Sequence, residues 1–426
     1  MTMIQHVRGR QVWDSRGRPT VEVEITLTGG AVGRAIAPSG ASTGRREALD
    51  RRAGGPRLGG YGVNGAIAAV NENIDPALRG LDASDQATID AALIALDGTP
   101  QKDRLGGNAI VATSLAAAWA TAAHKGVPLW RHLTELSGAS PRIPLPMIQI
   151  FGGGRHAGGR IDIQDYLVIA LGQRSFAEAC EMTAEVYIAA ARAMASGGKL
   201  NGIADEGGVW PDFTANEDGL GALTRAIEAA GLKPGVDMGI ALDVAASSFF
   251  VEGGYELALE GRRLDSAGMI EMLEGWVRDY PIVSLEDPMA EDDDEGFAEI
   301  TRRLGDKVQI VGDDYLVTSA ERVTEAAAAR ACNAALLKVN QCGTVSELIA
   351  AAKAARAEGW NAINSGRSGE SEDISLSHLA VGLGSEQIKV GSITRSERTA
   401  KWNEVIRIEE QGVALPCWQF TLPQRA

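Results

Sequence analysis

Cysteine, histidine and long apolar runs are scarce in this sequence. Its four cysteines form no C-x-x-C pair, so the sequence predicts reduced thiols and neither a disulfide framework nor a cysteine zinc site. Five histidines among 426 residues leave little for a mechanism that needs several of them. The amino-terminal stretch lacks the apolar core of a signal peptide, and no later run is long enough to span a bilayer. We therefore expect a cytoplasmic protein.

An excess of positive charge is also missing. The chain carries 41 basic and 56 acidic residues, which gives a formal net charge of -15. This balance argues against general adhesion to nucleic acid or to an anionic membrane. A small anionic substrate stays compatible with it, because a metal ion and a few arginines or lysines reverse the potential locally.

Carboxylates end three short apolar runs. MGIALD delivers Asp243, PIVSLED delivers Glu286, and VQIVGDD delivers Asp313. Three strands that each end in an acid predict hard oxygen ligands converging on one rim, where a divalent cation such as Mg²⁺ binds. The alternative is that these acids cap helix N-termini, which would suit Asp287 and Asp314.

Strands and helices alternate with little interruption from Met238 onward. Each apolar run, among them MGIALD, PIVSLED, AALLKVN and QIKVG, precedes a segment with helical periodicity. Repeated βα units of this length favour an α/β fold with a parallel barrel of the (β/α)8 type over an open sheet. In such a barrel the carboxyl ends of the strands form the active-site face.

The chain before residue 137 has a different pattern. Residues 7–37 alternate as strands with a hairpin turn at Gly29 and Gly30, and residues 60–126 are helical in pattern. The glycine- and proline-rich stretch 137–146 indicates a domain boundary. We therefore predict an N-terminal α+β domain at residues 1–136 and a barrel at residues 137–426.

Two lysines end apolar strands on the same predicted rim, Lys338 in AALLKVN and Lys389 in QIKVG. A lysine beside a divalent cation and a second lysine is pushed toward its neutral form, which a base for a carbon acid requires. The alternative is that each lysine extends from a strand end to the surface. Arg367 and Ser368 suit a phosphoryl group, because guanidinium binds two oxygens at once; a surface salt bridge is the alternative for Arg367.

Two loops are rich in small residues. PSGASTG opens a helix and offers backbone N–H groups and the hydroxyls of Ser39 and Ser42 to an anion. FGGGRHAGGR carries Arg155 and His156 and suits a loop that moves over a ligand. From the residues alone, a solvated loop histidine is the simpler interpretation of His156. Together with the lysines and acids, these loops predict proton abstraction from a phosphorylated carboxylic acid.

The ordered motifs resemble the enolase family over nearly the whole chain. They are DSRGRPTVEVE, PSGASTG, GGGRHAG, DEGG, LDVAAS, SLEDP, VGDD, LLKVNQCGTVSE, GRSGESED and the RSER of the last βα unit. The resemblance implies an N-terminal α+β domain that caps a modified (β/α)8 barrel, in a homodimer or higher homo-oligomer. It also implies interconversion of 2-phosphoglycerate and phosphoenolpyruvate with Mg²⁺, two ions per site, since a lysine base working with Mg²⁺ is general in that superfamily.

The resemblance assigns a role to each matching position. The metal ligands it implies are Asp243, Glu286, Asp313 and Ser42. The catalytic residues are the base Lys338, the carboxylate-side Lys389, Glu206 that assists departure of the 3-hydroxyl, the mobile-loop His156 and its partner Asp165. The residues expected around the substrate are Arg367, Ser368, Gln164, Gly366, Arg155, Ser39 and Gly40.

The family pattern breaks on one side of the predicted pocket. Gly366 stands where the family has a histidine, Arg155 replaces a serine, and Asp165 replaces a glutamate. Loss of a methylene at Asp165 moves its oxygens farther than catalytic positioning usually tolerates. The metal and base positions are unchanged, so the walls around the leaving group differ while the anchor of the site is kept.

Three functions remain open at this point. The lead hypothesis is a carboxyphosphonoenolpyruvate synthase-like enzyme of phosphonate (phosphinothricin-type) biosynthesis, with a small phosphorylated carboxylic acid and a second phosphonate or nucleotide-activated substrate. The alternative is an ordinary enolase, a 2-phosphoglycerate hydro-lyase with a tolerant site. A non-catalytic binding protein is the third hypothesis, which the retained metal positions disfavour.

Overall fold

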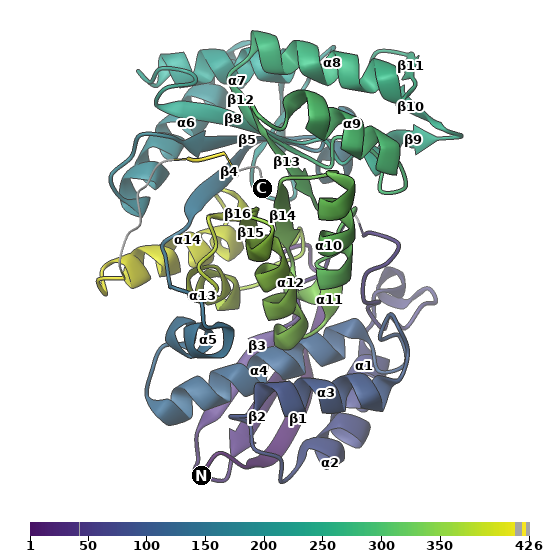
Figure 1. Cartoon of the computed structure of the whole chain (residues 1–426), viewed down its shortest axis with the longest axis vertical. Helices are drawn as coiled ribbons and strands as arrows, with labels where there is room; N and C mark the ends of the chain where they lie inside the picture. The colour runs from purple at the N-terminus through teal and green to yellow at the C-terminus, as the bar shows by residue number, and fades with distance from the viewer. Residues whose placement is uncertain (42, 414–419, 423–426) are drawn as a thin grey trace.

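The computed structural model describes residues 1–41, 43–413 and 420–422, and its first part is a small antiparallel sheet (Figure 1). The strands are β1 (Ile4–Trp13), β2 (Pro19–Leu27) and β3 (Val32–Ile36), in that spatial order. Gly30 in the β2–β3 turn has a φ of 85°, a left-handed conformation that glycine adopts without strain. The predicted hairpin is confirmed.

Helices follow this sheet in the chain. They are η1 (Arg57–Gly60), α1 (Asn64–Ala68), η2 (Ala69–Ile74), α2 (Asp75–Leu78), α3 (Gln86–Asp97), α4 (Gly107–Lys125) and α5 (Leu129–Ser137). Helix α4 ends at Gly126, whose φ of 65° makes it a left-handed C-cap, as the sequence predicted.

Helix α4 packs directly on β2 and β3. Its facing surface is built from small residues, and Gly33 on β3 lets the two backbones approach. A Cβ at Gly33 would lie 2.1 Å from the amide nitrogen of Ala120 and 2.2 Å from the carbonyl oxygen of Ala116. Only glycine fits there, because both neighbours are backbone atoms.

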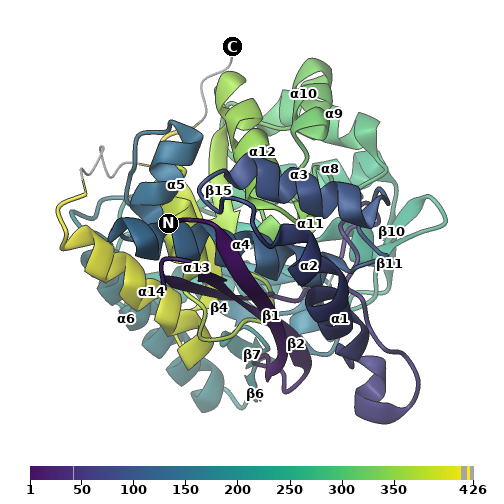
Figure 2. The same cartoon turned by 90° about the horizontal axis from the view of Figure 1, so that it is seen from below.

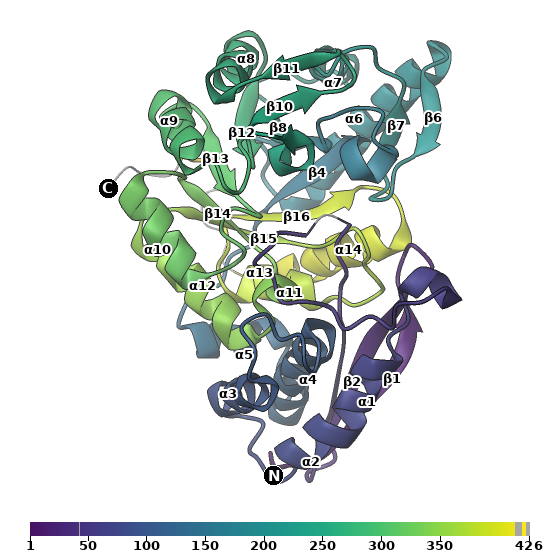
Figure 3. The ribbon, with the colours of Figure 1, turned by 90° about the vertical axis from the view of Figure 1, so that its right-hand side faces the viewer.

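Eight strands close into a barrel, with the helices outside it (Figure 3). Around the barrel they are β4 (Leu145–Gly152), β5 (Asp165–Ala170), β8 (Met238–Asp243), β12 (Ile282–Glu286), β13 (Gln309–Gly312), β14 (Ala334–Leu337), β15 (Asn361–Ser365) and β16 (Gln387–Ser392). Strand β16 pairs back with β4, and β5 runs antiparallel to both of its neighbours. The predicted modified barrel is therefore confirmed.

The remaining elements surround the barrel or decorate its ends. The helices are α6 (Phe176–Ser196), α7 (Glu217–Ala229), α8 (Ser266–Asp279), α9 (Asp294–Leu304), α10 (Ala320–Ala329), α11 (Val339–Cys342), α12 (Val345–Ala357), α13 (Ser375–Gly382) and α14 (Ser396–Glu409). The short elements are η3 (Gly154–Ala157), β6 (Leu200–Ile203), β7 (Val209–Pro211), η4 (Ala246–Phe249), β9 (Phe250–Val251), β10 (Gly254–Leu257) and β11 (Arg262–Leu264). No helix in the described ranges is long and apolar enough to cross a membrane.

The first part of the chain packs against the barrel helices (Figure 2). Helices α3 and α4 contact α12, and the amide of Ser346 at the start of α12 donates to Asp90 at 2.9 Å. Asp373 accepts the amide of Ile36 at 2.8 Å. One continuous apolar core runs through both parts of the chain. The division at residues 136 and 137 stays a prediction.

Candidate active site

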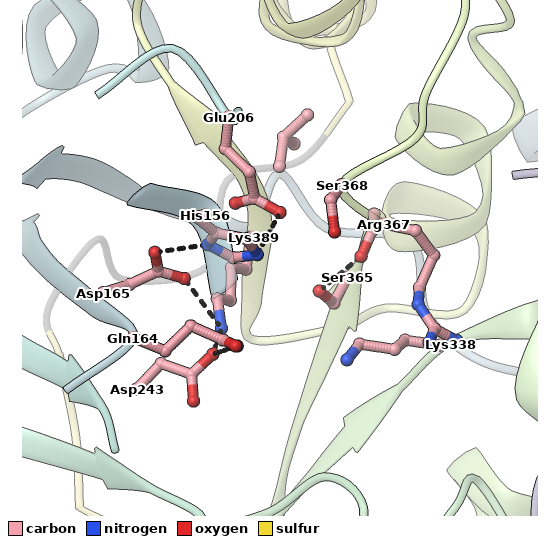
Figure 4. A pocket seen from close by; sticks show the side chains of 12 residues that line it. His156, Gln164, Asp165, Glu206, Asp243, Lys338, Ser365, Arg367, Ser368 and Lys389 are labelled. Carbon is pink, nitrogen blue, oxygen red and sulfur yellow. Dashed lines mark hydrogen bonds and ion pairs between the residues drawn. The ribbon is translucent and has the colours of Figure 1, made fainter. Parts of the chain in front are cut away.

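A pocket opens at one rim of the barrel, and Figure 4 shows the side chains that line it. It is lined by His156, Gln164, Asp165, Glu206, Asp243, Lys338, Ser365, Gly366, Arg367, Ser368, Lys389 and Val390. The structure thus brings together most of the residues that the sequence nominated, from strands β5, β8, β15 and β16, from the loops after β4, β14 and β15, and from the turn between β6 and β7. Their catalytic roles stay predictions.

Three strand-end carboxylates pair with two buried lysines. Asp243 and Glu286 end adjacent strands in register, and Lys389 Nζ lies 2.7 Å from a carboxylate oxygen of each. Lys338 Nζ forms an ion pair with Asp313, which follows β13. Both lysines are at most 8% exposed, so the surface-reaching interpretation is wrong for them.

The buried lysines and acids of the rim shift one another's pKa values. Burial lowers the pKa of Lys338, but the nearby carboxylates of Asp313 and Glu286 raise it by more. The pKa of Lys338 therefore lies above its ordinary value. Burial and the neighbouring Asp243 raise the pKa of Glu286 well above its usual range. Without a metal ion, the neighbouring side chains favour the ammonium form of Lys338, and the neutral base expected beside a divalent cation stays a prediction. Neutral Lys338 requires another positive charge among the carboxylates.

The acidic rim suits a divalent cation. The Lys389 ammonium already places one positive charge between two carboxylates of the rim. The acids also offer the hard oxygen ligands that Mg²⁺ takes. Among the described residues, the acidic group whose ligand atoms lie within 4.8 Å of one another is Asp287, Asp313 and Asp314. Asp243 and Glu286 lie outside that group. The predicted ligand set therefore stays a prediction, and Ser42 lies outside the described residues.

Asp287 has a role that the sequence did not reveal. Its carboxylate accepts the amide of Asp313 at 2.8 Å and the amide of Asp314 at 2.9 Å. It therefore fixes the turn after β13, and the interpretation of Asp287 as a helix cap is wrong. Ser319, by contrast, caps α10.

His156, Asp165 and Glu206 form the opposite wall of the pocket. His156 lies in η3 and is buried, so the interpretation as a solvated loop histidine is wrong. Its Nδ1 lies 2.8 Å from Asp165 Oδ1, and its Nε2 lies 3.6 Å from Glu206 Oε1. Burial lowers the pKa of His156, but Asp165 and Glu206 outweigh it and raise the pKa to about 9. Its acidic neighbours thus favour the protonated form of the imidazole.

Arg367 is buried, which contradicts the surface salt-bridge alternative. Its guanidinium bonds Glu47 at 2.9 Å and Asn340 at 3.1 Å. The fully buried Arg398 donates to the carbonyl oxygens of Arg367 and Ser368 and fixes the turn between β15 and α13. The sequence did not identify Glu47 and Arg398 as residues that support this turn. Arg398 does end the motif RSER, which was the one available signal.

The loop after β3 lies against the same turn. Ser39 and Gly369 exchange two backbone hydrogen bonds of 2.9 and 2.8 Å, and the amide of Ala41 donates to Ser368 Oγ at 3.1 Å. Arg155 reaches across to the carbonyl oxygen of Ala41 at 3.2 Å. The first and last thirds of the chain therefore meet at the mouth of the pocket.

Some predicted substrate residues stand beside the pocket and do not line it. The Ser39 hydroxyl accepts from Arg52 at 2.8 Å, and the Gly40 carbonyl oxygen accepts from Arg16 at 3.4 Å. Arg155 is likewise absent from the lining. Contacts of these residues with substrate stay predictions.

Comparison with known proteins decides the family. Residues 4–133 match the family model described as "Enolase, N-terminal domain", and residues 140–416 match "Enolase, C-terminal TIM barrel domain". The chain belongs to the enolase family. It is 50% identical over 410 residues to the protein named "Enolase 1" of Desulfitobacterium hafniense (strain Y51), which covers 96% of this chain and 93% of the relative.

As a member of the enolase family, this protein is a lyase. Its unusual residues are not confined to one side of the pocket: Asp165 pairs with His156, whereas Gly366 lies between Ser365 and Arg367, which Figure 4 shows on the other side. A Cβ on Gly366 would lie 3.1 Å from Glu370 Oε1, so the glutamate stands close to the space that a side chain at this position needs. The predicted homo-oligomer and cytoplasmic location stay predictions.

Proposed function

We propose that this protein is an ordinary enolase that interconverts 2-phosphoglycerate and phosphoenolpyruvate. The observation that carries the proposal is the opposition of Lys338 to Glu206 and His156 across one pocket, with Arg367 and Ser368 at its edge (Figure 4). The similarity to a protein named "Enolase 1" supports the same reaction. No comparison supports the phosphonate synthase hypothesis, so we prefer the alternative.

Elimination of water needs a base and an acid on opposite faces of the substrate. Lys338 takes the C2 proton as the base, and the electron pair of the broken C–H bond becomes the C2=C3 double bond. The bond from C3 to its hydroxyl oxygen breaks, and Glu206 gives a proton to the departing hydroxide, which leaves as water. The reverse reaction uses the same groups with their protonation states exchanged.

The other pocket residues bind and orient. Arg367 and Ser368 suit the phosphate, because a guanidinium and a hydroxyl donate to several of its oxygens. Lys389 faces the substrate carboxylate, on which negative charge grows as the proton leaves. Cationic His156 stabilises the hydroxide as it departs.

Magnesium completes the electrostatics of the proposal. Asp243, Glu286, Asp313 and Ser42 would hold Mg²⁺, which would neutralise the charge that develops on the substrate carboxylate. The residues fit, because an ammonium group already satisfies two of these carboxylates. Asp313 would then attract the Lys338 ammonium less strongly, so the pKa of Lys338 would fall and the lysine could serve as the base.

The direct test supplies 2-phosphoglycerate and Mg²⁺ alone and follows the absorbance of the phosphoenolpyruvate formed. We expect turnover of about 1 to 10³ s⁻¹ for the wild-type protein. Lys338→Ala should lower kcat by about 10²- to 10⁴-fold, because it removes the base. Lys353→Ala, on the exposed face of α12, is the control and should leave kcat unchanged. A folded wild-type protein that binds Mg²⁺ and forms no phosphoenolpyruvate would contradict the proposal.

A further inference from the structure

Gln149 is a fully buried glutamine in the middle of β4. It does not line the pocket, and neither its place in an apolar strand nor the family motifs gave it a role. A buried side-chain amide is costly unless its donors and acceptor find partners. The partners of Gln149 are Asp165 and the turn that carries Glu206, both in the wall of the pocket that we assign to departure of the hydroxide.

The first partner is Asp165. Gln149 Nε2 donates to Asp165 Oδ1, the same oxygen that lies 2.8 Å from His156 Nδ1. Asp165 is one methylene shorter than the glutamate of the family pattern, yet its carboxylate still meets the imidazole. The donor from Gln149 holds this shorter carboxylate on the histidine.

The second partner is the turn that carries Glu206. The amide of Gly208 donates to Gln149 Oε1 at 2.8 Å. Because a backbone N–H only donates, the oxygen of the Gln149 amide must face Gly208, which leaves the NH₂ for Asp165. A Cβ on Gly208 would come within 2.4 Å of Gln149 Oε1, so glycine is required for this approach.

These contacts make a closed ring. It runs from Gln149 to Asp165, to His156, to Glu206 3.6 Å away, and back through Gly208 to Gln149. The separation of His156 and Glu206 therefore depends on one buried amide.

We propose that Gln149 is a positioning residue that sets the separation of His156 and Glu206 for departure of the hydroxide. The inference rests on the proposed function, since it assigns Gln149 to one half of that reaction. The other half, removal of the C2 proton, belongs to Lys338 on the opposite wall, which has no bond to Gln149 among the described contacts. Loss of the amide should thus slow the two half-reactions unequally.

The experiment compares two rates on the same protein. Exchange of the C2 proton of 2-phosphoglycerate in D₂O reports on Lys338, and phosphoenolpyruvate formation reports on the whole reaction. Gln149→Met keeps the chain length and removes both hydrogen bonds. We expect phosphoenolpyruvate formation to fall about 10²-fold, as for a displacement of about 1 Å. We expect C2 exchange and KM to change less than about threefold.

Gln309→Met is the matched control. Gln309 is also fully buried in a barrel strand, and its Nε2 donates to Gln387 Oε1 at 2.9 Å, outside the pocket. We expect this variant to lose stability while the ratio of the two rates stays at the wild-type value. Equal losses of exchange and of product formation in Gln149→Met would overturn the inference, as would no loss of either.

A double variant keeps the test decisive if Gln149→Met does not fold. Gln149→Asn with Asp165→Glu moves one methylene from one side of the hydrogen bond to the other. We expect the double variant to form phosphoenolpyruvate faster than either single variant, and a rate no better than the slower single variant would overturn the inference. Wild-type protein with neither exchange nor product formation would overturn the proposed function as well, which separates the two failures.

Discussion

Glu370 is the nearest neighbour of the space beside Gly366 in the pocket wall. Its carboxylate accepts the amide of Arg367 at 3.0 Å and pairs with Lys401 at 2.9 Å. The glutamate therefore holds the backbone of the residue that we assign to the phosphate. Any side chain at position 366 must displace this glutamate or pack beside it.

Gly366→Ala should therefore weaken substrate binding more than it slows chemistry. The added Cβ would lie 3.1 Å from Glu370 Oε1 and 3.3 Å from Leu376, so the hydrogen bond to Arg367 lengthens. Loss of such a bond costs about 0.5 to 1.5 kcal/mol, or a rise in KM of about two- to twelvefold. Steady-state kinetics check this, with Gly221→Ala in α7 as the control. An unchanged KM with a lower kcat would place Gly366 at the reacting atoms instead.

Residue types alone identified the acids and lysines of the rim, because charges that end apolar strands are conspicuous in a sequence. They could not identify Gln149, Glu47 or Arg398. These residues act through partners 16 to 320 positions away in the chain, and a polar residue gives no sign of its distant partner. The protonation state of Lys338 also could not be predicted from the sequence, since its pKa depends on which carboxylates it contacts.

At the scale of elements, the barrel strands from β8 onward were predictable, whereas the first two barrel strands, β4 and β5, were not. β8, β12 and β13 follow one another as apolar runs that end in acids. β4 begins at Leu145, inside the stretch assigned to a domain boundary, because its prolines and glycines suggested a loop. β5 is antiparallel, so Asp165 lies at its amino end, where a search for acids at carboxyl ends does not look.

One methyl group added at Gly33 should disrupt the packing of β3 against α4. Gly33→Ala would place a Cβ about 2 Å from the backbone of α4, which cannot move without the whole helix. We expect the free energy of unfolding to fall by roughly 1 to 3 kcal/mol, the cost of overpacking. Urea denaturation measures it. An unchanged midpoint would mean that the helix and sheet adjust to the larger residue.

A buried histidine in α5, His132, contacts Lys125 at the end of α4. Lys125 Nζ lies 3.3 Å from His132 Nδ1, and burial together with this ammonium lowers the pKa of His132 to about 4. An unfolded chain takes up a proton at His132 near pH 6.5, whereas the folded protein does so only near pH 4. Stability from this site is therefore complete above pH 6.5 and is lost as the pH falls toward 4.

His132→Gln should remove that dependence. We expect the free energy of unfolding of the wild type to fall by up to about 3 kcal/mol more than that of the variant between pH 6.5 and 4, and by less after solvent screening. Urea titrations at several pH values check the difference. Parallel pH profiles for the two proteins would show that His132 is not the titrating group.

At the scale of the whole molecule, the cation site should couple to stability. Ligand that binds only the folded state stabilises it by about 2.7 kcal/mol at 100 times its Kd. We expect Mg²⁺ to raise Tm in the wild type and chelation to reverse the rise. Glu286→Gln should abolish the response, because it removes a buried carboxylate, while Glu321→Gln on exposed α10 should keep it. An equal rise in both variants would place the cation elsewhere.

The two parts of the chain should also unfold together. The apolar core contains Val7 and Leu115 from the first part and Leu285 and Leu348 from the barrel. Because each part loses buried surface when the other unfolds, we expect one calorimetric transition whose enthalpy equals the van't Hoff enthalpy. Differential scanning calorimetry checks this, and a resolved second transition would show that the domains are independent.

The hydrogen bonds between the loop after β3 and the turn at Gly369 have a consequence for synthesis on the ribosome. Ala41 and its partner Ser368 are 327 residues apart, so at 5 to 20 residues per second the first waits roughly 15 to 70 s for the second. The N-terminal sheet can form early in that interval. Strand β4 must meanwhile keep an open edge until β16 emerges to close the barrel. A nascent chain that stalls before residue 387 thus has a finished sheet, an unpaired barrel edge and no pocket.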